Sequence, residues 1–455
     1  MSFSVAVIGG GLAGVECAMR LNRFGFSVTL FEMKPQVMSK AHKSEFFAEL
    51  VCSNSFKSTE SHTAPGILKE EMKVLDSVIL VCAEMAKIPG GKALVVNREE
   101  FSRVVTEKVE SAGLRVIRQP VSSLEELSDF DFKVICTGPL TWKPLELELQ
   151  KFFGSDWLSF FDAVSPIIDG SSIDFSQGFW GGRYSDQNDY FNIPLSREEY
   201  YKFVEMIRKA EKFEPVLDEE KDYKTFNGCQ PIEDIAAKGV ESLRFAQFSP
   251  KGLSQDAYAV IQLRKEDLAG NAFSLVGFQT RLKHPEQKKL LQSLPALKNC
   301  EILRYGVMHR NTYLKSPQLL NKDLSAKKDP TLFFAGQITG VEGYLESAAS
   351  GLYVAYQLAA RVSGFKDPVP ENSILGGLIK YVTEYTGKDF QPMNANFGLL
   401  DCGKILETEK IKDKRQQRLV LSKICVQNIQ NWKNSFEKHF NDFLKLGVGQ
   451  SVLEA

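Results

Sequence analysis

The sequence predicts an α/β protein whose N-terminal part is a Rossmann-like fold built on a parallel sheet. Three features predict it: a β-branched apolar run at 4–8, a glycine-rich turn at 9–14, and helically spaced apolar residues followed by a second apolar run at 28–31. Such runs suit strands buried on both faces, and strand–helix–strand is the repeating unit of parallel sheets. The rest of the chain is predicted to interrupt this fold with an inserted α+β domain and to end in a helical region.

The glycine-rich turn fits the GxGxxG pattern of dinucleotide-binding folds and reads Gly9-Gly10-Gly11-Leu12-Ala13-Gly14. Gly9 permits the tight turn, Gly11 lets a pyrophosphate approach the backbone, and Gly14 lets helix and strand pack closely. The N-terminus of the following helix offers free N–H groups and the positive end of its dipole to phosphates. Glu32 lies 18 residues after Gly14, where a carboxylate accepts hydrogen bonds from a ribose. All six turn residues and Glu32 are therefore predicted to bind a dinucleotide.

Two later segments indicate that the dinucleotide is FAD, held by a glutathione-reductase-like domain. Residues 133–140 have the pattern of an apolar strand ending in Thr-Gly, and residues 331–336 that of a buried strand ending in glycine. A loop at 337–340 and a helix beginning near Glu346 resemble the flavoprotein segment that closes over ribityl and pyrophosphate. Such proteins often carry Asp where this chain has Gln337, and the chain has no second GxGxxG for a nicotinamide nucleotide. The further cofactor-binding residues predicted here are Gly138, Gly336, Gln337, Gly340 and Gly343.

The separation of these segments along the chain predicts its domain organisation. A chain of 455 residues is too long for one compact core. We expect an FAD-binding domain at 1–150 and 325–365, with an inserted α+β substrate domain at 151–324. A largely helical segment at 366–455 is expected to pack on the FAD-binding domain.

The composition is that of an ordinary globular protein, with 43% hydrophobic residues, 25% charged residues and a net charge of −1. No global basic field therefore indicates a nucleic-acid partner, although a local basic face can still bind phosphates. One basic cluster fits either a solvated helix face or a phosphate site, and consists of Lys410, Lys412, Lys414, Arg415 and Arg418. The N-terminus lacks the pattern of a signal peptide, and no stretch reaches the roughly 20 apolar residues that span a bilayer. We expect a cytoplasmic protein without a membrane partner.

Cysteines and histidines supply the candidate reactive groups. Eight cysteines without a CxxC pair, and five histidines, predict no metal site. Cys52 precedes a turn or helix-cap pair, and fits either a buried structural thiol or a thiolate activated at a helix start. Cys229 lies in a glycine–proline turn, where exposure favours reactivity. The adjacent His309 and Arg310 fit either a proton donor with an anion clamp, or a hydrogen-bonded histidine with a salt-bridged arginine.

Seven blocks of the sequence together resemble one family, the bacterial folate- and FAD-dependent tRNA (uracil-5-)-methyltransferases. The blocks read VAVIGGGLAGVECAMRL, AHKSEFFAELVCSNS, GILKEEM, NGCQPIE, YGVMHRNTY, FFAGQITGVEGYLESAASGL and FQPMNANFGLL. The similarity runs from Val5 to about Leu400, and flavoproteins in general do not share the later blocks.

The resemblance implies an unusual methyl transfer. The methylene group of 5,10-methylenetetrahydrofolate passes by way of reduced FAD to C5 of a uridine in the tRNA T-loop, and NADH or NADPH supplies electrons. Uracil C5 is a poor nucleophile until a thiolate adds at C6. By the matched motifs, Cys229 is the expected C6 nucleophile and Cys52 its partner near the flavin. His309, Arg310 and Asn311 are the expected substrate-binding residues.

Two segments depart from the family pattern. The family usually has a PAGGALAVDR-like segment where this chain has PGGKALVVNR at 89–98, so Asn97 replaces an acid in a loop expected near the cofactor. After Leu400, residues 401–404 replace an expected proline-rich turn. Because the C-terminal part is a candidate RNA contact, these changes leave a ribosomal RNA uridine open as the target.

Three other functions compete with this interpretation. The FAD protein that modifies wobble uridines with a partner GTPase shares the GxGxxG start, but it is longer and fits the NGCQPIE and MHRN blocks poorly. A flavin oxidoreductase acting on a small metabolite would need neither folate nor RNA. A non-catalytic flavoprotein that binds RNA or protein would tolerate serine at Cys52 and Cys229.

Overall fold

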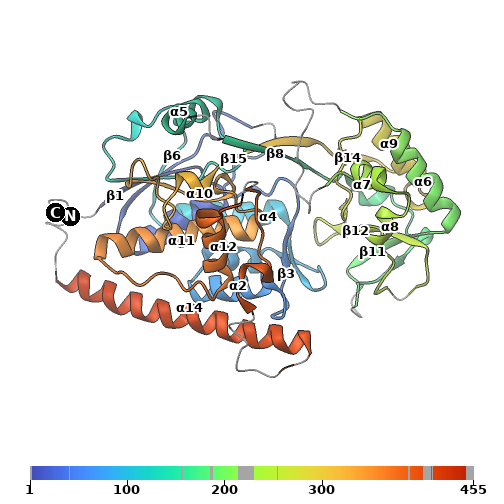
Figure 1. Cartoon of the computed structure of the whole chain (residues 1–455). Coiled ribbons are helices and arrows are strands. Elements are labelled where there is room, and N and C mark those ends of the chain that lie inside the picture. Colours follow the sequence, from blue (N-terminus) through green and yellow to red (C-terminus); the bar gives the residue numbers. More distant parts are fainter. Residues whose placement is uncertain are drawn as a thin grey trace.

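The computed structural model describes residues 3–39, 41–154, 157–184, 188–213, 230–253, 255–387, 390–402, 411 and 413–446, without the side chains of 157–163 and 308–311. Figure 1 shows a larger body, covered on one side by a long C-terminal helix, and a smaller body joined to it by a narrow ribbon of strands. Each body has its own apolar core. Buried apolar side chains form one cluster drawn from 5–153 and 313–440, and a second cluster drawn from 168–300. The predicted domain limits themselves stay a prediction.

The larger body is built on a five-stranded sheet in the order β16-β7-β1-β2-β6, with every neighbouring pair parallel. The strands are β1 (Ser4–Ile8), β2 (Ser27–Phe31), β6 (Arg115–Ile117), β7 (Phe132–Ile135) and β16 (Leu332–Phe334). The α/β fold class with a parallel sheet is confirmed. The strand predicted at 133–140 ends at Ile135, so Thr137 and Gly138 lie in the loop beyond its carboxyl end.

Two helices from opposite ends of the chain cross closely over this sheet. They are α1 (Leu12–Arg23) and α11 (Tyr344–Ser363), which begins two residues earlier than the sequence predicts. A Cβ atom on Gly351 would lie 2.1 Å from the Ala13 carbonyl oxygen. Only glycine therefore allows this approach, and it brings the start of α11 beside the glycine-rich turn.

A three-stranded sheet and three helices complete the first half of the larger body. The sheet has the order β3-β5-β4, formed by β3 (Ser55–Ser58), β4 (Lys87–Ile88) and β5 (Ala93–Val96). The helices are α2 (Ala64–Val74), α3 (Val78–Met85) and α4 (Arg98–Ser111), and α5 (Lys143–Phe153) follows later. Cys52 thus precedes a strand, so the helix start considered for activating it is wrong. Its surroundings must come from tertiary contacts.

A two-stranded antiparallel ribbon joins the two bodies. It pairs β8 (Trp157–Ala163) with β15 (Met308–Leu314), the segments by which the chain enters and leaves the smaller body. Figure 1 shows this ribbon running outward from the larger body. After β15, the short α10 (Ser316–Leu319) leads the chain back toward the parallel sheet.

The smaller body is a six-stranded antiparallel sheet with helices on one face. Its order is β10-β11-β12-β13-β9-β14, from β9 (Ile167–Asp169), β10 (Phe179–Trp180), β11 (Tyr190–Leu195), β12 (Ala259–Lys265), β13 (Ala272–Leu275) and β14 (Ile302–Arg304). The helices are α6 (Arg197–Lys209), α7 (Ile232–Lys238), α8 (Ser242–Phe245) and α9 (His284–Gln292). Alternation along the strands sends Ile261 and Leu263 into the apolar core, while Gln262 and Arg264 point to the opposite face. This polar face is important for the site described below.

The C-terminal part is helical, with α12 (Ile374–Glu384) and the 32-residue α14 (Lys414–Lys445). Figure 1 shows α14 lying along the side of the larger body formed by α2 and α11. Its Trp432 and Phe436 rings pack with Tyr356 of α11, and Phe436 is fully buried. Among the described helices, none is both long and apolar enough to cross a bilayer.

Candidate active site

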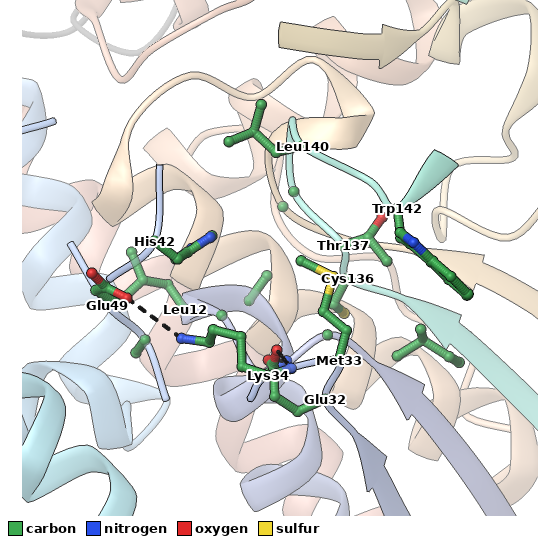
Figure 2. Close-up of a pocket in the computed structure, with 18 of the residues that line it drawn as sticks. Leu12, Glu32, Met33, Lys34, His42, Glu49, Cys136, Thr137, Leu140 and Trp142 are labelled. Carbon is green, nitrogen blue, oxygen red and sulfur yellow. Dashed lines mark hydrogen bonds and ion pairs between the residues drawn. The ribbon is translucent and has the colours of Figure 1, made fainter. Parts of the chain in front are cut away.

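A cleft opens at the carboxyl ends of the parallel strands, where open α/β sheets bind ligands. The loops after β1, β2, β7 and β16 form its walls, together with residues 42–51 and the first turn of α11. Figure 2 shows Leu12, Glu32 and Lys34 on one side of the cleft, facing Thr137 and Trp142 on the other. Every residue of the predicted turn from Gly9 to Ala13 lines it, as do Glu32 and Gly138. The dinucleotide site predicted from local sequence is thus brought together in one place.

The glycines of the turn differ in what a side chain would meet. Gly9 has a φ of +105°, and its Cβ would lie 2.6 Å from the Cys136 carbonyl oxygen. A Cβ on Gly14 would lie 1.8 Å from the Gly9 oxygen, so helix and turn touch there. A Cβ on Gly11 would meet nothing within 4 Å, because this residue faces the cleft. The space over Gly11 is the approach that a pyrophosphate requires.

The start of α1 has the free donors that an anion needs. Gly11 is the N-cap and provides no side chain, and the first turn of the helix carries no acidic residue. Leu12 and Ala13 line the cleft, and the N–H groups of a helix's first turn have no partner within the helix. Helix dipole and backbone donors both favour a phosphate at this position. The turn and helix therefore fit the pyrophosphate of FAD.

Glu32 is the acid that follows β2, and the residue is 5% exposed. Its Oε2 accepts a hydrogen bond from the Gly10 N–H at 2.8 Å, and its Oε1 accepts one from the Lys34 N–H at 2.9 Å. A carboxylate oxygen can accept a second hydrogen bond. Glu32 thus stabilises the glycine turn, and its contact with a ribose stays a prediction.

Lys34 is a buried lysine in the cleft wall that the sequence analysis did not single out. Its Nζ donates to the Phe46 carbonyl oxygen at 2.5 Å and lies 3.7 Å from Glu49 Oε2. Burial lowers the pKa of Lys34, while the Glu32 and Glu49 carboxylates oppose that effect. Figure 2 shows Lys34 and Glu49 pointing toward one another, with His42 above them. Its position two residues after the acid predicted to bind a ribose was the one local signal for Lys34.

The loop between β16 and α11 brings the late segment to the cleft. Gly336, with a φ of +84°, and Gln337 line it, and the Gln337 Nε2 donates to Glu342 Oε2 at 2.5 Å. Gly340 and Gly343 also have positive φ values, but neither is among the residues that line the cleft. A Cβ on Gly340 would meet the Phe390 ring, and one on Gly343 would meet Glu346 Oε2. These two glycines shape the loop, and their contact with a cofactor stays a prediction.

Cys52 lies beside Tyr344, the first residue of α11. The Tyr344 hydroxyl is 2.9 Å from the Cys52 Sγ, and it accepts from the Cys52 N–H at 2.7 Å and the Ser53 N–H at 3.1 Å. Burial raises the pKa of the Tyr344 hydroxyl well above its ordinary value, and the neighbouring Cys52 adds to this. Val51 and Tyr344 line the cleft, whereas Cys52 is not among the lining residues and lies next to both. Tyr344 is 292 residues away in sequence, and it was not predicted as a site residue.

Arginines surround the backbone that leads to Cys52. Arg98, the first residue of α4, donates to the Leu50 carbonyl oxygen at 3.2 Å and forms a two-fold ion pair with Glu266. Arg264 donates to the Ser53 hydroxyl at 3.1 Å. Asn97 caps α4 by accepting from the Glu100 N–H, which Asn and Asp do about equally well. The replacement of the family's acid at this position therefore preserves a helix cap, and Asn97 is not among the residues that line the cleft.

Four predicted site residues lie wholly or partly outside the described part of the structure. His309, Arg310 and Asn311 lie on β15, where they pair with Asp162, Phe161 and Phe160 of β8. Their side chains lie outside the described part of the structure, and so does the whole of Cys229. Of the remaining described side chains, no group of three or more His, Cys, Asp or Glu residues is placed to hold a metal ion.

The chain matches known proteins along almost its whole length. A family model described as glucose inhibited division protein A (GIDA) matches residues 4–366. A protein of Thermotoga sp. (strain RQ2), named methylenetetrahydrofolate–tRNA-(uracil-5-)-methyltransferase TrmFO, is 47% identical over 440 residues, which cover 94% of this chain and 98% of that protein. A protein of Sulfurihydrogenibium sp. with the same name is 45% identical, covering 95% of this chain and 98% of its own length.

The chain belongs to the TrmFO family. This confirms the resemblance seen in the seven sequence blocks. The fold agrees: Aquifex aeolicus GidA superimposes with a TM-score of 0.69 at 18% identity, over 98% of this chain and 76% of that one. That likeness shows the fold alone. Within the TrmFO family, this chain provides the nucleotide cleft, the Cys52–Tyr344 pair at its wall and the arginines beside it.

Proposed function

We propose that the protein transfers the methylene carbon of 5,10-methylenetetrahydrofolate to C5 of a uridine in the tRNA T-loop. FAD is its cofactor and NADH or NADPH the reductant, and bound FAD supplies the electrons and the carrier chemistry. The observation that carries the proposal is a cysteine, Cys52, hydrogen-bonded to a buried tyrosine at the wall of a dinucleotide cleft, in a chain 47% identical to a relative named for this reaction. Transfer of a carbon to C5 requires such thiol chemistry beside the cofactor.

The residues of the cleft have separate tasks in this proposal. The free N–H groups at the start of α1 bind the pyrophosphate, and Glu32 accepts from the adenosine ribose. The Tyr344 hydroxyl contacts the Cys52 sulfur and also accepts from the backbone N–H groups of Cys52 and Ser53, so it fixes the position of the cysteine. The hydroxyl's raised pKa keeps it protonated at neutral pH, so it can donate to a Cys52 thiolate. Cys52 is thereby positioned to take and release the carbon that is transferred.

Cys229 is assigned the other thiol role, addition to uracil C6. Such addition makes C5 an enolate carbon, and a base must later remove the C5 proton as the sulfur leaves. The assignment rests on the match of its NGCQPIE block to the family. Replacement of Cys229 by serine should abolish methyl transfer and leave the flavin spectrum intact, which a spectrum and a single assay on the purified variant can check. Full activity of Cys229→Ser would remove it from this role.

The experiment that tests the function uses a carbon label. The purified protein, with its flavin spectrum confirmed, is incubated with NADH or NADPH and methylenetetrahydrofolate labelled in the methylene carbon, with undermodified tRNA and ribosomal RNA in separate reactions. Label in 5-methyluridine of tRNA is the expected result. Label only in ribosomal RNA would keep the chemistry and change the target. Absence of label from both RNAs, with normal flavin reduction, would favour an oxidoreductase acting on a small molecule.

The site of action proposed for the protein is the cytoplasm, where its tRNA substrate and both small-molecule substrates are present. The lack of a bilayer-spanning helix among the described residues is consistent with this location. Fractionation of cells that express a tagged full-length chain would test it, and recovery with the membrane pellet would contradict it.

A further inference from the structure

The polar face of the antiparallel sheet carries a row of side chains that the proposed function does not yet use. Neighbouring strands place Arg264 of β12 opposite Ser274 of β13, and Ser274 opposite Ile167 of β9. A shift of register in β14 between Ile302 and Arg304 then brings Arg304 opposite Ile167. Residues that lie directly opposite each other across strands project from the same face. Arg264, Ser274 and Arg304 therefore lie in one row across four strands, with Ile167 between Ser274 and Arg304.

Several polar atoms of this row have no hydrogen-bond partner among the described residues. Arg264 Nε, Ser274 Oγ, and Arg304 Nε and Nη2 are each buried from solvent and have no hydrogen-bond partner among the described residues. Buried polar groups are nearly always hydrogen-bonded, and an unsatisfied one costs about 1–3 kcal/mol. Four such atoms in one row indicate donors arranged for a ligand that brings acceptors.

The charged side chains around the row carry an excess of positive charge. Arg98 approaches it from the larger body, and Glu266 is the carboxylate that pairs with Arg98, at 2.6 Å from Nε. Burial lowers the pKa of Arg264, and burial together with the Arg98 charge lowers the pKa of Arg304 to about 10. Three guanidinium groups thus share this one carboxylate. A further anion would relieve both the repulsion and the desolvation.

The row is next to the reactive end of the cleft. Arg264 donates to the Ser53 hydroxyl, and Arg98 to the Leu50 and Val51 carbonyl oxygens, so the cluster adjoins the residues on both sides of Cys52. Arg98 and Arg304 both interact electrostatically with Cys52 and Tyr344. A ligand whose reacting carbon meets Cys52 can therefore reach the row with another part of the same molecule.

We propose that Arg264, Ser274 and Arg304, with Arg98, form an oxyanion site that binds a carboxylate of the folate donor. The inference rests on the proposed function, which requires a folate at Cys52. Folates carry a glutamyl tail with two carboxylates, and a guanidinium pairs with a carboxylate through two parallel N–H···O bonds. The site would thus fix the tail on the smaller body while the larger body holds the flavin.

A carboxylate fits the position better than an RNA phosphate does. Phosphate contacts of nucleic-acid-binding proteins are made mainly by exposed basic residues that release counterions. Here the donor atoms are buried, and they lie where the two bodies meet, with Asn54 of the larger body donating to the Lys265 carbonyl oxygen at 3.1 Å. A small carboxylate requires less space at such a site than a duplex backbone, which would need an open surface.

The test compares two ligands on the FAD-loaded, full-length protein. Tetrahydrofolate and tetrahydropteroate, which lacks the glutamyl tail, are titrated by equilibrium dialysis into the parent protein and into Arg304→Met and Arg264→Met. Arg103→Met is the matched control, because Arg103 is an exposed arginine on α4 paired with Glu100. We expect the parent to prefer tetrahydrofolate by about 10- to 100-fold, as one charged hydrogen-bonded contact gives. Each site variant should lose most of that preference, and Arg103→Met should keep it.

Each other outcome overturns the inference. An unchanged preference in both site variants would show that the row does not contact the tail, and equal weakening of both ligands would show a structural role. Weakened tRNA binding with unchanged preference would assign the row to phosphate. Failure of the parent to bind either ligand would overturn the proposed function as well, whereas label transfer with an unchanged preference would overturn the inference alone.

Discussion

At the scale of single residues, the glycines of the turn serve two different purposes, cofactor binding and helix packing. Gly11 and Gly14 are three positions apart on the same turn and helix, yet a Cβ on the first would enter the open cleft and a Cβ on the second would strike the Gly9 oxygen at 1.8 Å. The sequence pattern predicts a role for both glycines. The structure shows that they are needed for different reasons.

Substitution of alanine at these two positions should therefore give opposite results. Gly11→Ala should fold with the parent's thermal midpoint but copurify with little FAD, because the methyl group occupies the approach of the pyrophosphate. Gly14→Ala should unfold at a lower temperature whether or not FAD is added, because a backbone overlap of this size requires the helix to move. Flavin content and thermal melts of the two apoproteins measure both effects. Parent-like flavin content in Gly11→Ala would contradict the assignment of this space to the cofactor.

The Tyr344 hydroxyl makes a second prediction at this scale. Tyr344→Phe removes the hydroxyl that contacts the Cys52 sulfur and that accepts from two backbone N–H groups. We expect the single-turnover rate of methyl transfer to fall about 10- to 100-fold, the value of one hydrogen bond to a charged group, and its pH profile to move. Tyr353→Phe is the control, since Tyr353 lies on the same helix and donates to Lys322 away from the cleft. A rate and profile equal to the parent's would exclude a role for the hydroxyl.

At the scale of elements, buried carboxylates hold helix starts in place. Glu71 of α2 is fully buried, and its two oxygens accept from the Ile374 and Leu375 N–H groups at the start of α12. Glu16 of α1 does the same for the start of α3 through Val78 and Ile79. The negative charge suits the positive end of a helix dipole. Burial nevertheless raises the pKa of each carboxyl group from 4.5 to about 7.

These pKa values predict how stability depends on pH. A native-state pKa above the unfolded one means that the folded protein binds more protons between pH 4.5 and 7, so the Glu71 contribution is full below pH 4.5 and is lost as pH rises through 7. The total loss is about 3 kcal/mol for one such group. Glu71→Gln should therefore show a smaller drop in urea midpoint between pH 5 and pH 8 than the parent. Glu70→Gln, exposed on the same helix, should retain the parent's drop; an equal drop in all three proteins would contradict the assignment.

Elements were predicted from the sequence wherever the signal is local. The runs at 4–8 and 28–31 and the helix after the glycines have the expected type. Ser53-Asn54 was predicted to be a turn or a helix cap, and the helix cap was wrong, because the strand β3 follows. Turn-forming residues are common to both situations, and the pairing of β3 with β5, 35 or more residues later, decides between them.

At the scale of the whole molecule, two bodies with separate apolar cores meet through polar contacts. The Tyr190 hydroxyl donates to the Gly90 carbonyl oxygen, the Gly91 N–H donates to Asp189, and Arg98 pairs with Glu266. Interfaces of this polar kind are typical of domains that move relative to each other. The cleft belongs to the larger body, so a bound cofactor should stabilise the two bodies unequally.

Removal of FAD should make this difference visible. A ligand present at 100 times its Kd adds about 2.7 kcal/mol to the stability of the fold that binds it. In the stripped protein, amide hydrogens of β1 and α1 should exchange faster, while those of β11 and β12 in the smaller body should keep their rates. Hydrogen exchange followed by mass spectrometry measures both regions in one sample, and added FAD should restore the first. Equal acceleration in both regions would show that the two bodies unfold as one unit.

The sequence by itself determined the cofactor and the family. The glycine turn, the acid after the second strand and the helix between them lie within about 30 residues, so local spacing places them together whatever the rest of the chain does. The tertiary structure alone decided the surroundings of the thiol. Tyr344 reaches Cys52 across 292 residues, and Arg264 and Arg304 share a face only because β13 and β9 pair between their strands. No short-range pattern encodes such contacts, because strand register and helix crossing are set by burial of two apolar cores.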